Sequence, residues 1–366
     1  MTFRSPVTGR VLTRDTPQSL RDEAGERWPV VDGITYLRAG RESLVARTLD
    51  LLDRGETDEA LVVLLADQDD WWNGPQTVPS ELRELIRNRD RLTLREAMAL
   101  LRFGPVADYF AHRWSDPTYL AGLALLEAHW KSPKTSFELA AGIGHYAREL
   151  DGKGVHCTCA DVVFAKCWLA KHWVAPDADY LVFDAGKPWP IAGSTFDLVH
   201  CQDAFYFLPD QTVVADRLRD MVAEGGTLAV GHLHNADVNG GPMGPARTAD
   251  EWAALFPDAR IYDEQALLSA MMDGVVPDAI DWCDDTGIEA WSVVEGGVNP
   301  RALTGGVCVP PATAQLRANP LIGADGPAWP SPRYEREYAP RATWTDRRFV
   351  TTPDRDRRLL DLPERW

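Results

Sequence analysis

Short apolar runs alternate with amphipathic stretches between residues 136 and 297 of this chain. The runs have the length of buried strands, and several of the stretches between them have helical spacing. The candidate strands are 136–140, 155–160, 179–183, 196–201, 226–232, 260–262 and 290–294, with a helix near 263–272. The alternation predicts an α/β fold with a doubly wound, mostly parallel seven-stranded sheet that helices cover on both faces.

The regions on either side have different patterns. Asp32-Gly33 between two apolar runs is a hairpin signal. Thr93 and Glu96 have the spacing of a capping box at the start of a helix. The C-terminal region is rich in Pro, Arg and aromatic residues and has little periodicity. We therefore predict four parts: a small β-rich segment (1–38), a helical cap (39–114), the α/β domain (115–297) and an irregular C-terminal extension that wraps this domain (298–366).

Composition narrows the classes of partner. The 366 residues include 38 Lys and Arg against 55 Asp and Glu, a formal net charge of −17, which disfavours a nucleic-acid partner. No run of 18 apolar residues indicates a membrane span, and no apolar signal region starts the chain, so we expect a cytoplasmic protein. None of the six cysteines forms a C-x-x-C pair, so we expect no metal site and no disulfide framework.

The strongest motif is a strand followed by a turn of small residues. It runs Phe137-Glu138-Leu139-Ala140-Ala141-Gly142-Ile143-Gly144 and leads into a helix. Small residues in such a turn let the backbone approach a bound ligand closely. A tight turn that only packs is the alternative.

The acids that follow later strands make a cofactor site the better interpretation. Asp161 stands 17 residues after Gly144, where an acid can bind both hydroxyls of a ribose. Asp184, followed by the small Ala185, ends the next strand and can accept the amino group of an adenine. A nicotinamide dehydrogenase would share this local geometry.

Residues 136–232 resemble the class I S-adenosylmethionine-dependent methyltransferases, whose sheet is Rossmann-like. The first motif of that family is an acid followed by spaced glycines; here it reads Glu138, Ala140, Gly142 and Gly144, with alanine at one glycine position. The resemblance implies S-adenosyl-L-methionine as cofactor, with Glu138 ordering its methionine end through the loop.

The later motifs favour this family over the dehydrogenases. The resemblance implies that Asp161 binds the ribose and that Asp184 and Ala185 flank the adenine. It also implies that Cys201, Gln202 and Asp203, after the fourth strand, line the floor near the methyl group. The segment 205–210 matches the one that follows in the family. None of these motifs identifies the methyl acceptor.

A second resemblance concerns the N-terminus. Residues 5–9 and 25–34 look like a small zinc-ribbon-like domain that accompanies some methyltransferases. In its metal-binding form, cysteines would stand near Ser5, Thr8, Arg21 and Ala24, and all four are absent. We therefore expect no zinc here and a docking or scaffolding role, with an unrelated hairpin arm as the alternative.

Four residues after the fourth and fifth strands are candidates for acceptor chemistry. An oxygen or nitrogen acceptor can need a general base, and His232, His234, Tyr206 and Asp203 lie where open α/β sheets bind ligands. Structural, hydrogen-bonded histidines are the alternative.

We expect O- or N-methylation of a small-molecule or peptidic acceptor, as in natural-product modification. The cap and the extension would enclose the site. Non-methyl chemistry with the same cofactor, or a non-catalytic binding or scaffold role, stays open. A homodimer is one assembly that the sequence leaves open.

Overall fold

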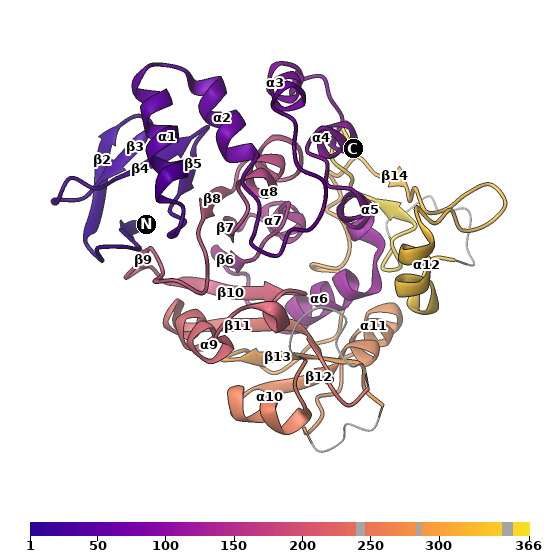
Figure 1. The fold of residues 1–366 in the computed structure, drawn as a ribbon. Coiled ribbons are helices and arrows are strands. Elements are labelled where there is room, and N and C mark those ends of the chain that lie inside the picture. The colour runs from indigo at the N-terminus through magenta and orange to yellow at the C-terminus, as the bar shows by residue number, and fades with distance from the viewer. Residues whose placement is uncertain (239–245, 283–286, 346–353) are drawn as a thin grey trace.

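Seven strands form the central sheet of the protein, shown in Figure 1. The computed structural model describes residues 1–238, 246–282, 287–345 and 354–366. The strand order is β12-β13-β11-β10-β6-β7-β8, in which β13 is antiparallel to both neighbours and the remaining pairs are parallel. The strands are β6 (Thr135–Leu139), β7 (His156–Asp161), β8 (Asp179–Val182), β10 (Phe196–Gln202), β11 (Val222–His234), β12 (Arg260–Asp263) and β13 (Ala290–Glu295). This confirms the predicted Rossmann-like fold.

The N-terminal strands extend this sheet. β5 pairs in parallel with β8 and continues, through antiparallel pairs, to β4, β3, β2, β1 and β9, so these six strands and the central seven make one 13-stranded sheet. The predicted seven strands are therefore only part of it, because the edge strand β8 has free backbone groups that β5 satisfies. Asp32 and Gly33, with φ of 54° and 75°, form the predicted hairpin turn. The added strands are β1 (Thr2–Arg4), β2 (Val11–Thr16), β3 (Ser19–Arg21), β4 (Arg27–Val31), β5 (Ile34–Tyr36) and β9 (Ile191–Ala192).

Two facing turns in the N-terminal segment are joined by oxygen-bearing side chains. The Ser5 hydroxyl donates to Glu26 and accepts the N–H groups of residues 7 and 8. The Thr8 hydroxyl donates to Asp22 at 2.7 Å, and Asp22 accepts two further backbone N–H groups. Of the four positions discussed above, Ser5 and Thr8 thus lie at this contact, where hydrogen bonds hold the turns together.

Helices cover the sheet and build the cap. α6 packs against β11, β13 and α11, α9 packs against β10 and β11, and α7 and α8 cover β7. The capping box at Thr93 and Glu96 starts α4 as predicted. Cap helices are α1 (Glu42–Asp53), α2 (Thr57–Leu65), α3 (Pro79–Asn88), α4 (Leu94–Leu100), α5 (Pro105–His112) and the 3-10 turn η1 (Arg113–Ser115). The others are α6 (Pro117–Ala128), α7 (His145–Asp151), α8 (Phe164–Leu169), the π-helical η2 (Ala170–Val174), the 3-10 turn η3 (Phe205–Phe207), α9 (Gln211–Asp220), α10 (Ala249–Leu255) and α11 (Glu264–Asp273).

The C-terminal extension contains short elements and lies beside α4 and α5 in Figure 1. Its elements are β14 (Arg317–Ala318), α12 (Pro332–Tyr338), the 3-10 turn η4 (Ala339–Arg341) and β15 (Leu359–Leu360). Leu321, Tyr334, Tyr338 and Trp344 form a small apolar cluster separate from the main core. Among the described residues, no helix combines the length and the apolar character needed to cross a membrane.

Candidate active site

The small-residue turn after β6 folds as a cradle. Ala140, Gly142 and Gly144 have φ of 58°, 56° and 81°, and Gly144 caps the start of α7. Left-handed backbone is natural for glycine but costs an alanine roughly 1–2 kcal/mol, so Ala140 holds a strained conformation. Strain of this kind is concentrated at functional sites. The turn therefore presents backbone that a bound ligand can approach closely.

Asp161 is tied to this turn. Its two carboxylate oxygens accept the N–H of Gly142 at 3.0 Å and the N–H of Val163 at 2.9 Å, and the Lys166 ammonium lies 3.4 Å away. Asp184, half-buried after β8, accepts the N–H of Gly186 at 2.8 Å. Both predicted acids, with Ala185, therefore lie at the carboxyl edge of the sheet, and Asp161 contacts the turn directly.

The residues at this edge fit S-adenosylmethionine. Glu138 is 4% exposed, and its Oε2 atom finds no hydrogen-bond partner among the described residues. Burial raises the pKa of this carboxyl well above its usual range, while the positive charge of Arg113 lowers it. An unpartnered buried acceptor is costly unless a ligand satisfies it. A cofactor with a positively charged amine would supply a hydrogen-bond donor to this oxygen and a positive charge beside the carboxyl group.

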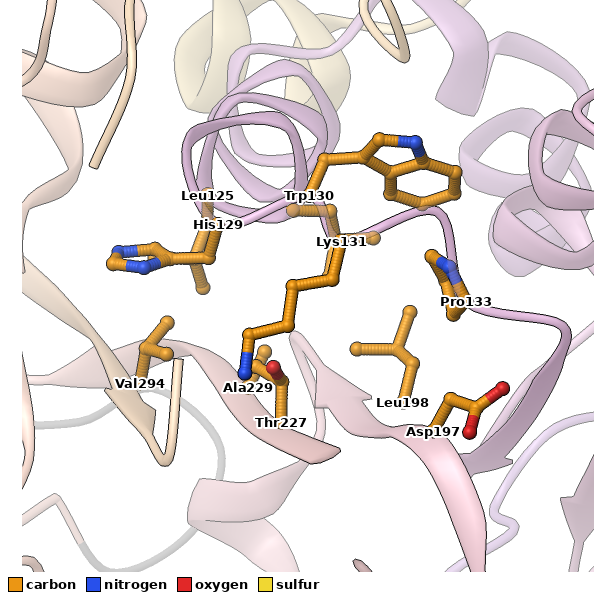
Figure 2. A pocket seen from close by; sticks show the side chains of 11 residues that line it. Leu125, His129, Trp130, Lys131, Pro133, Asp197, Leu198, Thr227, Ala229 and Val294 are labelled. Carbon is orange, nitrogen blue, oxygen red and sulfur yellow. The ribbon is translucent and has the colours of Figure 1, made fainter. Parts of the chain in front are cut away.

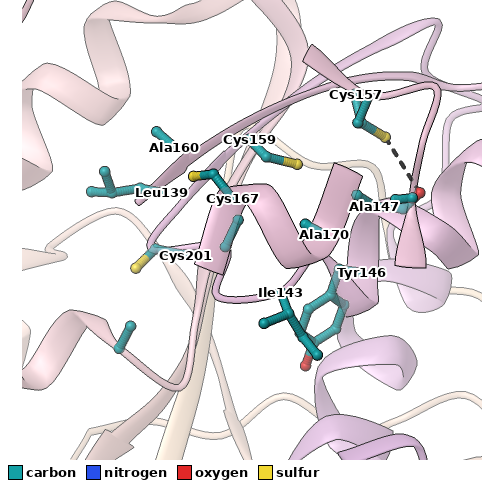
Figure 3. Close-up of a cluster of buried hydrophobic side chains, with 14 of the residues drawn as sticks. Leu139, Ile143, Tyr146, Ala147, Cys157, Cys159, Ala160, Cys167, Ala170 and Cys201 are labelled. Carbon is teal, nitrogen blue, oxygen red and sulfur yellow. Dashed lines mark hydrogen bonds between the residues drawn. The ribbon is translucent and has the colours of Figure 1, made fainter. Parts of the chain in front are cut away.

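Cys201 and Gln202, which were predicted to line the floor, are the last two residues of β10, so their side chains point to opposite faces of the sheet. Cys201 is fully buried among apolar side chains, with Cys159, Cys167 and Leu139 nearby in Figure 3. Burial raises the pKa of its thiol well above its usual range. The four thiols in this view are therefore core-filling groups. The dashed contact in the figure joins the Cys157 sulfur to a backbone carbonyl.

Gln202 faces a gap that two glycines leave open. Its Oε1 atom would lie 2.0 Å from a Cβ on Gly231 and 3.1 Å from one on Gly122, and its amide donates to the carbonyl of Ala229 at 3.5 Å. Any side chain at Gly231 would displace this amide. The glycine in β11 is therefore required by the placement of Gln202 at the carboxyl edge.

The cap closes over the cradle. A Cβ on Gly142 would lie 3.1 Å from the ring of Phe110 in α5, and the Phe110 carbonyl is 2.9 Å from Nε2 of His145. The fully buried Arg113 in η1 pairs with Asp116 and Asp203, each at 2.9 Å. His145 is therefore engaged with the cap, and Arg113 lies between the cradle and the floor.

Asp203 is the centre of a buried polar cluster. It has φ of 54° and accepts the Tyr109 hydroxyl at 2.9 Å, besides its ion pair with Arg113. Burial raises its pKa, but Arg113 and His232 outweigh this effect and hold the pKa below its ordinary value. The Nε2 atom of His232 lies 3.7 Å from Asp203, and the Tyr206 hydroxyl donates to Asp203 at 3.5 Å. The structure thus brings the sequence-predicted His232, Tyr206 and Asp203 together.

The C-terminal extension holds the covering segment in place. The side chains of Tyr334, Trp344 and Trp366 donate to the carbonyls of His112, Ser115 and Ala111 at 3.2, 3.3 and 2.7 Å. The last carbonyls of a helix lack partners within it, so these donors satisfy the end of α5 and η1. The extension therefore packs on the cap segment that covers the cradle.

Two hollows in the described part of the chain lie away from the cradle. Figure 2 shows one of them between the end of α6 and the first residues of β10, where Lys131 and Asp197 face it. Lys131 donates to the carbonyls of Gly225 and Gly296 at 2.8 and 3.0 Å. A shallower depression lies on the cap beside Arg95 and Met98. None of the predicted site residues lines either one.

Sequence reasoning missed the groups that complete the site. Arg113, Tyr109 and Phe110 come from the cap, and Glu264, which contacts His232 at 2.7 Å, comes from α11. Arg113 at the end of an apolar helical stretch carries no motif. Glu264 directly follows a strand and starts a helix, and this position is the one feature in the sequence that could have pointed to it. Acidic residues are common in the first turn of any helix, so the position alone does not indicate a functional role.

Comparisons with known proteins agree with the motif assignment. Residues 137–230 match the family model described as a methyltransferase domain. No curated protein matches the chain. Among solved structures, the chain is similar to the CcbJ methyltransferase from Streptomyces caelestis (12% identity, 51% of this chain and 96% of that one, TM-score 0.38) and to human N-acetylserotonin methyltransferase in complex with SAM (15%, 61% and 70%, TM-score 0.37).

A third solved structure is SAM-bound CalS10, an amino pentose methyltransferase from Micromonospora echinaspora, with 20% identity over 35% of this chain and 56% of that one and a TM-score of 0.29. At these values the structures say nothing about the acceptor. The matched residues 137–230 include the cradle, Asp161, Asp184 and the predicted floor. Residues 137–230 of this chain are therefore similar to a methyltransferase domain.

Proposed function

We propose that this enzyme transfers the methyl group to an oxygen or nitrogen atom of a small-molecule or peptidic acceptor. The observation that carries the proposal is the convergence of His232, His234, Tyr206 and Asp203 at the carboxyl ends of β10 and β11. The Tyr206 and His234 rings are 4.4 Å apart, and the His232 and His234 rings are also 4.4 Å apart. These groups adjoin the predicted floor beneath the methyl group, where an acceptor must approach.

The cofactor residues are assigned in the same proposal. Ala140, Gly142 and Gly144 form the cradle, Glu138 faces the methionine end, and Asp161 binds the ribose. The adenine lies at Asp184 and Ala185, and Cys201 and Gln202 support the floor. S-adenosylmethionine supplies an activated methyl group when bound. The chain then has to orient the acceptor in line with that group and keep water away from it.

Exclusion of water is the role that we assign to the cap and the extension. Phe110 lies against Gly142, and the extension pins α5 and η1 through three hydrogen bonds. The negative net charge supports a small or peptidic acceptor over a nucleic acid.

Cofactor binding is testable without knowing the acceptor. Native mass spectrometry of the purified protein should detect retained S-adenosylmethionine or S-adenosylhomocysteine. Calorimetry with S-adenosylhomocysteine should then show that Asp161→Ala loses about 1.5–3 kcal/mol of binding free energy, because hydrogen bonds to a charged group are removed. Asp177→Ala, at an exposed acid before β8, is the matched control and should bind as the unmodified protein does. Equal affinity in the Asp161 and Asp177 variants would reject the ribose assignment.

Methyl transfer itself is tested with S-adenosylmethionine carrying a radioactive methyl group. The protein is incubated with a small-molecule and peptide extract of the producing cells, and acid-stable label outside the cofactor is counted. We expect label to move to the extract. A protein that binds the cofactor tightly yet moves no label would favour the binding or scaffold alternative.

A further inference from the structure

The last residues of β11 bring two histidines, in different protonation states, to the proposed acceptor site. The pairing of β11 with β13 shifts between Val230 and Leu233, and His232 has φ of 62°, so the strand leaves its regular pleat at this point. Both rings meet the Tyr206 ring edge-on, at 6.0 Å for His232 and 4.4 Å for His234. The two side chains therefore share one small space, and their other neighbours decide what each can do.

His232 is held by acids on both sides. Its Nδ1 atom is 2.7 Å from Oε2 of Glu264, and its Nε2 atom is 3.7 Å from Oδ1 of Asp203. Glu264 is 2% exposed; its other oxygen accepts the Ser292 hydroxyl at 3.2 Å, and the Arg341 guanidinium of η4 lies 4.0 Å from Oε2. Burial lowers the pKa of His232, but the Glu264 and Asp203 carboxylates outweigh burial and raise this pKa to about 9.

His234 lacks such a partner. Its Nδ1 atom is buried and finds no hydrogen-bond partner in the part of the chain that the structure describes. Burial and the positive charge of His232 lower its pKa to about 4, although Asp203, Glu264 and Glu289 act in the opposite direction. At neutral pH the ring is uncharged, and one of its nitrogens can accept a proton.

We propose that His234 takes the proton of a hydroxyl acceptor, and that Glu264 is a positioning residue that locks His232 beside it, so that the site is built for O-methylation. This inference rests on the proposed function. Glu264 touches neither acceptor nor cofactor; it acts by fixing the His232 ring. Neither Glu264, His232 nor His234 lies within residues 137–230, which match the methyltransferase domain.

The chemistry of the transfer distinguishes a hydroxyl from an amine. The acceptor oxygen bonds to the methyl carbon as the carbon–sulfur bond breaks, and the electron pair of that bond stays on sulfur. The oxygen then carries three substituents and a positive charge, and its proton passes to a ring nitrogen of His234 and later to solvent. Such a proton is acidic enough for a weak base. An alkylammonium, with a pKa of about 10.4 in the case of lysine, would keep its proton beside His234.

Histidine titration tests the positioning role without any acceptor. In the full-length protein with ¹⁵N-labelled histidines, NMR should show one ring that stays protonated to about pH 9, and the His234 ring should be among those that stay neutral to about pH 4 or below. His232→Gln and His234→Gln assign the two signals. Glu264→Gln should lower the His232 midpoint by about one pH unit or more. Glu289→Gln, which faces Arg341 at 3.9 Å, should leave the midpoint unchanged. An unmoved midpoint in Glu264→Gln would overturn the positioning role.

The chemical class of the methylated product tests the acceptor. With the extract assay described above, label should appear in ethers or esters, and label in amines would overturn the hydroxyl assignment. His234→Gln should slow transfer about 100-fold or more while S-adenosylhomocysteine binds as before, since general bases contribute 10²–10⁴ in rate. Transfer at the full rate by this variant would also overturn the proposal. No transfer by the unmodified protein would instead contradict the proposed function.

Discussion

The ion pair between Arg357 and Glu149 is the contact most suited to measuring how the extension is anchored. The Arg357 guanidinium is 2.8 Å from the Glu149 carboxylate, and the two side chains are 0% and 1% exposed. Two guanidinium nitrogens of Arg357 and one Glu149 oxygen have no other partner among the described residues. Glu149 lies in α7, which starts at the cradle residue Gly144, so this pair links the extension to the cofactor loop.

The burial of both charges determines how much each substitution should change the free energy of unfolding. Removing one partner leaves an unpaired charge in the interior, which costs about 3–5 kcal/mol, whereas replacing both by apolar side chains is often neutral or stabilising by about 1–4 kcal/mol. Arg357→Met and Glu149→Leu should each lower the free energy of unfolding by about 3–5 kcal/mol. The double variant should recover most of that loss, because neither charge then remains buried alone.

Urea unfolding followed by tryptophan fluorescence measures all four proteins of this cycle. The exposed pair of Arg333 and Glu337, 3.7 Å apart at 58% and 48% exposure, supplies the control, since removing Arg333 should cost at most about 1 kcal/mol. The reasoning fails if Arg357→Met costs as little as Arg333→Met. It also fails if the double variant is no more stable than the weaker single variant.

Three other predictions follow from the described contacts. Burial lowers the pKa values of His145 and His200 to about 3, so the free energy of unfolding should fall as the pH drops from about 6 towards 3. In urea titrations at pH 6, 5 and 4, His200→Phe should reduce that slope by about 1.4 kcal/mol per pH unit, and an unchanged slope would contradict this. The protein should contain no stoichiometric zinc, because oxygen-bearing side chains satisfy one another at the N-terminal turns; elemental analysis that finds one zinc per chain would contradict this. A chain that ends at Gly297 should lose the pinned cap and methylate more slowly, and a truncated protein that works at the full rate would refute the site-closing role of the extension.

The sequence predicted the sheet well because its signals there are local. Each parallel strand is a short apolar run between turns, and a run such as 196–201 needs no distant information to be recognised. The pairing of β5 with β8 was out of reach, since it joins residues about 145 positions apart and depends on which edge is left open. The hairpin at Asp32 was predicted because its turn chemistry lies in two adjacent residues.

The site was predicted only where motifs and strand ends coincide. Acids such as Asp161 follow strands at family-defined positions, so their place at the carboxyl edge could be derived. Arg113 and Glu264 come from helices, where a charged residue usually faces solvent, and nothing in the spacing shows that they are buried. Tertiary packing decides that, and only the structure reveals it.

The match to the methyltransferase domain does not identify the acceptor, because it leaves out the cap, α11 and the C-terminal extension. Residues 137–230, which match the methyltransferase domain, contain the cradle, the two acids and Asp203. In the proposed acceptor site, the charged groups around Asp203 lie outside this span: Arg113 in the cap, His232 and Glu264 beyond the matched segment, and Arg341 in the extension. Glu264 and Arg341 are not among the residues assigned to the cofactor, so substitutions there would change the charge beside His232. Acceptor specificity in this protein is therefore to be sought by substitutions in α11 and η4, with cofactor affinity measured alongside.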